Sequence, residues 1–90
     1  MTTTFRRHPD LRLAALDGEG VVLHLGSRKY FTVSETGVAI LELLEQPRAL
    51  DQLIAGLMER YDVDAAHADQ SVRAVLDRCR SVGLILESES

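Results

Sequence analysis

The chain has 90 residues, of which 46% are hydrophobic, 27% charged and 4% aromatic, a composition typical of one folded domain and too apolar for a disordered chain. No uninterrupted apolar run exceeds four residues, so we expect neither a membrane span nor a secretion signal. The net charge of −4 argues against general binding to nucleic acid phosphates. The single cysteine, Cys79, cannot form an intramolecular disulfide, and we expect a cytoplasmic protein.

The first part of the chain predicts strands. Residues 1–10 show no hydrophobic periodicity, and we interpret them as a flexible amino-terminal arm. Hydrophobic residues then alternate in three segments, 11–16, 21–25 and 30–33, separated by turn signals at 17–20 and 26–29. This pattern predicts a three-stranded antiparallel meander.

The remainder predicts helices. Ser34 is suited to cap a first helix that ends before Pro47, and a second helix runs from Leu50 or Asp51 to Tyr61. Asp64 is suited to cap a third helix, which runs to Val82. Gly83 fits the left-handed residue after a helix end, residues 84–86 complete the core, and residues 87–90 form a disordered acidic tail. Strands followed by helices indicate one α+β domain over residues 11–86.

No catalytic constellation is apparent, so we expect a protein that is not an enzyme and that has no metal or cofactor. The three histidines, His8, His24 and His67, lie apart in the sequence and fit solvated surface positions better than a metal site. Cys79 falls on the apolar stripe of the third helix, which favours packing over nucleophilic chemistry.

The third predicted strand is the strongest candidate for a functional site. Residues 30–33 contain neither proline nor an acidic side chain, and an edge strand of this kind can accept an extended peptide by strand addition. The alternation places Phe31 and Val33 toward the core and Tyr30 and Thr32 outward, although its phase could be reversed. On the third helix, Arg73 and Arg80 are seven residues apart, forming either a solvated flank or a cationic rim, while Arg78 points elsewhere.

The segment from Lys29 to Gly37, KYFTVSETG, followed by Ile40 to Leu44, ILELL, resembles the PqqD-like family, as do the residues at Leu53, 61–63 and 83–85. The resemblance spans about residues 11–86 and implies a winged helix-turn-helix-like recognition element of RiPP (ribosomally made, modified peptide) biosynthesis. Such a domain binds the leader of a precursor peptide as a strand added to its third strand, in a cleft completed by the third helix.

The resemblance also implies binding residues and partners. The peptide-binding residues would be Arg28, Lys29, Tyr30, Phe31, Thr32, Val33, Asp69, Val72, Arg73, Leu76 and Arg80. The partners would be the precursor peptide and a leader peptidase or other modifying enzyme. Four departures from the family pattern, at Arg28, Ser34, Leu41 and Ser71, favour a stand-alone protein of lasso peptide biosynthesis over a chaperone of pyrroloquinoline quinone biosynthesis.

Two other functions fit the same predicted elements. A winged helix can bind DNA, but the third helix mixes acidic and basic side chains, which is unfavourable for a helix in the major groove. A small subunit that binds a protein partner without any leader peptide is the other alternative.

Overall fold

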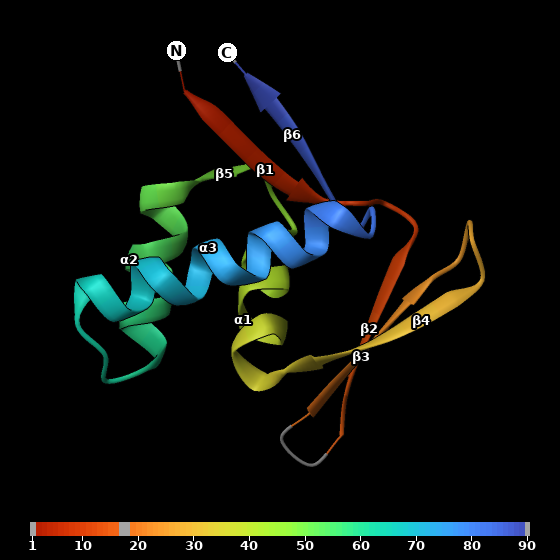
Figure 1. Cartoon of the computed structure of the whole chain (residues 1–90), viewed down its shortest axis with the longest axis horizontal. Helices are drawn as coiled ribbons and strands as arrows, with labels where there is room; N and C mark the ends of the chain where they lie inside the picture. Colours follow the sequence, from red (N-terminus) through yellow and green to blue (C-terminus); the bar gives the residue numbers. More distant parts are fainter. Residues whose placement is uncertain (1, 17–18, 90) are drawn as a thin grey trace.

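The computed structural model describes residues 2–16 and 19–89, and these form two antiparallel sheets and three helices (Figure 1). The predicted meander is present as β2 (Leu11–Leu16), β3 (Glu19–His24) and β4 (Lys29–Ser34), paired in the order β2-β3-β4. Three helices follow it: α1 (Glu35–Leu43), α2 (Leu50–Arg60) and α3 (Ala65–Ser81). The predicted α+β class, a three-stranded antiparallel sheet followed by three helices, is therefore confirmed. Of the first predicted turn, residues 17 and 18 lie outside the described residues.

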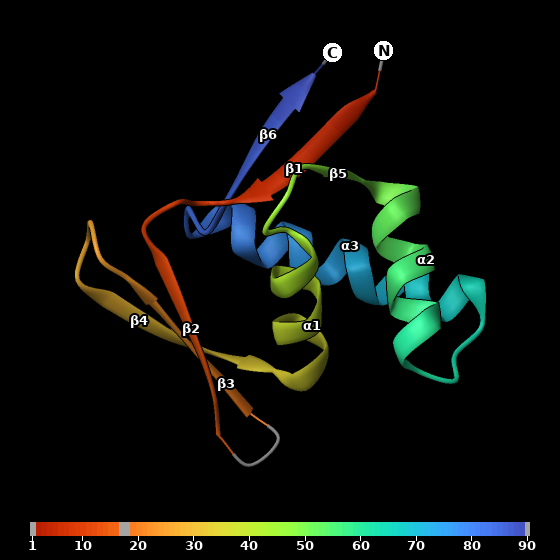
Figure 2. The ribbon, with the colours of Figure 1, turned by 180° about the vertical axis from the view of Figure 1, so that it is seen from behind.

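A second sheet was not predicted from the sequence. In it β1 (Thr3–Arg7) lies between β5 (Arg48–Ala49) and β6 (Ile85–Glu89) and is antiparallel to both. Figure 2 shows β1 and β6 side by side as an antiparallel pair that extends beyond the helices. The predictions of a flexible arm and a disordered tail are wrong where β1 and β6 run. The reason is that Thr4 pairs with Ala49 and Ser88, which are distant in sequence and leave no local periodicity.

The predicted helix boundaries are set by the residues expected to set them. The Ser34 hydroxyl accepts a hydrogen bond from the Gly37 N–H at 3.1 Å, and the Asp64 carboxylate accepts one from the His67 N–H at 2.7 Å. After α3, Gly83 adopts a φ of 78°, the left-handed conformation that favours glycine. These residues mark the starts of α1 and α3 and the end of α3, and β4 leads directly into α1.

The core lies between the two sheets and the helices. Its fully or nearly fully buried side chains come from every layer of the fold and include Val22 and Val33 of the meander, Ile40 and Leu41 of α1, Leu53 and Leu57 of α2, and Val72, Leu76 and Cys79 of α3. This packing holds β3 and β4 against α1 by one face and leaves their other face exposed to solvent.

A buried glycine sets the distance between the meander and α1. A Cβ at Gly20 would collide with Val38 of α1 and would crowd Val33 of β4. We therefore expect Gly20→Ala to lower the free energy of unfolding by about 1–3 kcal/mol, measured by urea denaturation. Gly56→Ala is the matched control, because its Cβ would meet only the flexible Leu43 side chain and alanine favours the helix. Equal stability of Gly20→Ala and the wild type would contradict this account of the packing.

Candidate functional site

The candidate site is the open edge of β4. This strand ends the order β2-β3-β4, and within the described residues only β3 pairs with it. The Thr32 carbonyl is turned away from β3, since it accepts a hydrogen bond at 3.1 Å from a guanidinium nitrogen of Arg78 in α3. In an antiparallel pair, the N–H and C=O of one residue point to the same side, and this side alternates along the strand. The backbone groups of Tyr30 and Thr32 therefore face the open edge, and those of Phe31 face Val22 in β3.

The side chains of β4 alternate as the sequence predicted. Val33 is buried and Phe31 is half-buried against the core, whereas Thr32 is exposed and Tyr30 is 73% exposed. The predicted phase is thus confirmed. Tyr30 lies opposite Leu23, which is also exposed, so the outer face of the meander carries an apolar pair beside the open edge.

Two cations lie where the hairpin enters β4. Arg28 has a φ of 59°, and its N–H donates a hydrogen bond to the His24 carbonyl at 2.8 Å, closing the turn. Lys29 is the first residue of β4, and both side chains are exposed. A positive φ favours glycine, so Arg28 adopts a backbone conformation that is uncommon for a residue with a side chain.

The α3 residues predicted to bind peptide lie elsewhere. Val72 and Leu76 are buried in the core. Arg73 and Arg80, with Leu76, line a cavity of about 210 Å³ that is completed by Phe5 of β1, Leu50 of α2 and Asp77. The structure therefore groups the predicted cationic rim with the second sheet rather than with β4.

Each arginine of that rim has an acidic partner. Arg73 pairs with Asp69 one turn earlier in α3, while Arg80 pairs with Asp77 at 2.6 Å and with Glu87 of β6. The hydrogen bonds to Asp77 and then Glu87 raise the pKa of the Arg80 guanidinium above its ordinary value. These pairs neutralise much of the positive charge that Arg73 and Arg80 would offer to a DNA phosphate, which weakens the DNA-binding alternative.

Arg78 was predicted from the sequence to point away from the site, and this prediction is wrong. Arg78 is the α3 side chain that reaches the β4 edge, and Ser71, two turns earlier, lines a cavity beside Thr36 at the start of α1. A helical wheel separates this flank from that of Arg73 and Arg80, but the sequence alone does not show which flank lies beside the sheet. No signal short of the tertiary fold identifies Arg78.

The other chemically distinctive residues have structural partners. The Nδ1 atoms of His8 and His24 accept hydrogen bonds from the backbone N–H groups of Asp10 and Ser27, at 3.1 and 3.2 Å. Burial raises the pKa of the Cys79 thiol, which therefore stays protonated.

Within residues 2–16 and 19–89 no group of three metal-ligating side chains converges. No helix in those ranges combines the length and apolar character needed to cross a membrane.

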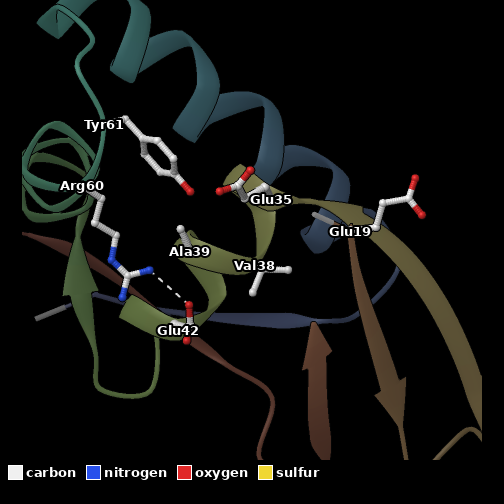
Figure 3. A pocket seen from close by; sticks show the side chains of 7 residues that line it. All are labelled: Glu19, Glu35, Val38, Ala39, Glu42, Arg60 and Tyr61. Atoms are coloured by element: carbon white, nitrogen blue, oxygen red, sulfur yellow. Dashed lines mark hydrogen bonds and ion pairs between the residues drawn. The ribbon is translucent and has the colours of Figure 1, made fainter. Parts of the chain in front are cut away.

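A separate cavity of about 340 Å³ lies between α1, α2 and the start of β3. Figure 3 shows its lining, in which Val38 and Ala39 lie among Glu19, Glu35, Glu42, Arg60 and Tyr61. Arg60 pairs with Glu42 at 3.1 Å, and the Tyr61 ring points toward Glu35.

The fold has relatives among known proteins. Residues 19–85 match the family described as coenzyme PQQ synthesis protein D (PqqD). A solved structure, TbiB1 in complex with the TbiA(beta) leader peptide, aligns with a TM-score of 0.73 at 25% identity, covering 89% of this chain and 93% of that chain. A lasso peptide synthetase B1 complexed with its leader peptide aligns with a TM-score of 0.72 at 23% identity, covering 91% and 96%, and this likeness shows the fold. No curated protein matches the sequence significantly.

Proposed function

This chain belongs to the PqqD family, and from that premise we propose that it is a RiPP recognition element, a domain that binds the leader of a precursor peptide by strand addition to β4. The observation that carries the proposal is the open β4 edge, where the backbone groups of Tyr30 and Thr32 face outward beside α3. An extended peptide gains its main-chain hydrogen bonds from such an edge and its specificity from the neighbouring side chains.

The relatives support the same function. TbiB1, the neighbour at 25% identity, is described in complex with a leader peptide, and its chain corresponds to this one over nearly its whole length. We propose that this chain likewise serves lasso peptide biosynthesis. It would act as a non-catalytic adaptor that delivers the precursor to a separate leader peptidase or other modifying enzyme. A chaperone role in pyrroloquinoline quinone biosynthesis is the alternative within the family.

Of the residues predicted from the sequence, those of β4 and its turn are the proposed direct contacts. Along β4 and its turn, Arg28 to Val33 supply the backbone edge and the side chains on either face of it. Arg73, its partner Asp69, and Arg80 lie on the flank of α3 beside Phe5, so we do not propose that they contact a peptide on β4. Val72 and Leu76 would act through the packing of α3, since both are buried.

The test uses the isotope-labelled chain and each short precursor-like peptide encoded beside its gene. We expect one of these peptides to shift the amide resonances of Tyr30 and Thr32 and to protect both amides from hydrogen exchange. The mass of that peptide should not change during the incubation. Cleavage of the peptide by the purified domain would refute the adaptor role, and perturbations confined to residues outside β4 and α3 would refute strand addition.

Gene neighbours separate the two pathways. A transglutaminase-like protease and an asparagine-synthetase-like cyclase beside the gene would support lasso peptide biosynthesis. A radical SAM enzyme in their place would favour the quinone pathway.

A further inference from the structure

Arg78 differs from the other arginines of the helices in its partner. Within the described residues Arg60, Arg73 and Arg80 each take part in ion pairs, whereas Arg78 takes part in none. Arg78 donates a hydrogen bond to the Thr32 carbonyl of β4, which is a neutral acceptor. This hydrogen bond lies on the protein surface. A guanidinium has five N–H donors, so this contact leaves both its positive charge and most of its donors available to a ligand.

The charge along the β4 edge is positive, although the whole chain has a net charge of −4. Arg28 and Lys29 lie at the start of the strand, Arg78 reaches its middle, and the strand itself contains no carboxylate. Neither Arg28 nor Lys29 forms an ion pair with any residue that the structure describes. An edge of this charge attracts acidic peptides and repels basic ones.

We propose that Arg78 is a specificity-determining residue of this edge and that it selects peptides carrying a carboxylate side chain. The inference rests on the proposed function, since it concerns the peptide added to β4. In the free protein, the Arg78 guanidinium donates a hydrogen bond to the Thr32 carbonyl. When a peptide strand is added, a peptide N–H takes over that carbonyl, and the guanidinium moves to the peptide carboxylate. A neutral acceptor is thereby exchanged for a charged one, which forms the stronger hydrogen bond.

The geometry also predicts where the carboxylate lies. Because the Thr32 N–H and C=O face the peptide, one peptide residue pairs directly with Thr32, and its side chain shares the outer face with that of Thr32. Arg78 comes from α3, which packs in the core on the same side of the sheet as Phe31. The carboxylate therefore belongs to a residue adjacent to the one that pairs with Thr32, whose side chain points to the face of α3.

The experiment selects a displayed library of random dodecapeptides on the immobilised domain. The wild type should enrich peptides that contain Asp or Glu, Arg78→Gln should lose this enrichment, and Arg78→Lys should keep part of it. Arg60→Gln is the control. It removes a cation that pairs with Glu42 in the cavity between α1 and α2, and it should behave as the wild type. Peptides selected by the wild type should bind Arg78→Gln about two- to fivefold more weakly at low salt, and this difference should shrink at high salt.

Each outcome decides between the hypotheses. The same acidic enrichment on wild type and Arg78→Gln, with equal melting temperatures, would overturn the role of Arg78 and leave the proposed function standing. Enrichment of peptides without acidic bias on the wild type would do the same. If no peptide were enriched on any variant, or if selected peptides did not perturb the β4 amides, the proposed function would fail and this inference with it.

Discussion

Thr32→Pro is expected to weaken peptide binding strongly while leaving the domain folded. The Thr32 N–H faces the open edge, so proline at this position removes a donor that the incoming strand needs but no hydrogen bond to β3. The proline ring also occupies the space that a paired strand would enter at about 4.8 Å. Losing the hydrogen bond and leaving a peptide acceptor unpaired costs about 2–3 kcal/mol, which is roughly a 100-fold loss of affinity by calorimetric titration.

Two control variants distinguish an edge effect from a folding defect. Thr32→Val keeps the N–H and the extended preference of the residue, and it should bind peptide nearly as the wild type does. Phe31→Pro places the same ring one residue earlier, where the N–H pairs with Val22 of β3, and it should destabilise the meander itself. A folded Thr32→Pro protein that binds peptide tightly would rule out strand addition to β4.

The sequence predicted those parts of the fold that local patterns encode. Alternation along 11–16 and 30–33 predicts strands because each residue's face depends only on its neighbours. The caps Ser34 and Asp64 act on residues three positions away, so both helix starts were predictable. The open edge of β4 was predictable for the same reason, since a meander of three short-turned strands leaves its third strand at an edge.

The parts that could not be predicted depend on residues distant in sequence. Arg78 and Thr32 are 46 positions apart, and their contact exists only because α3 packs with one particular flank toward the meander. The predicted apolar stripe of α3 includes the buried residues Val72, Leu76 and Cys79, but a stripe determines which residues are buried and not which flank meets which strand. The same limit explains why Arg73 and Arg80 were expected beside β4, when they lie beside Phe5.

Removal of residues 1–7 is expected to destabilise the domain strongly, although the sequence predicts a flexible arm there. β1 is the central strand of the second sheet, so its loss leaves both β5 and β6 without their partner. It also removes Phe5, which packs against the core, and the hydrogen bond from the Arg7 N–H to the Leu44 carbonyl at 3.1 Å. We expect the free energy of unfolding to fall by about 3–5 kcal/mol, a large part of the ~5–15 kcal/mol typical of a domain.

The matched variant for this truncation is Phe5→Ala in the full chain, which keeps the β1 backbone and should cost about 2 kcal/mol in denaturant unfolding, because Phe5 is half-buried. Equal melting temperatures for the truncated and full chains would show that residues 3–7 contribute nothing to stability and that the arm is dispensable.

Peptide binding provides an independent readout. Since β4 belongs to the other sheet, the folded fraction of the truncated protein should still bind peptide, and the loss should appear as a smaller active fraction with an unchanged dissociation constant.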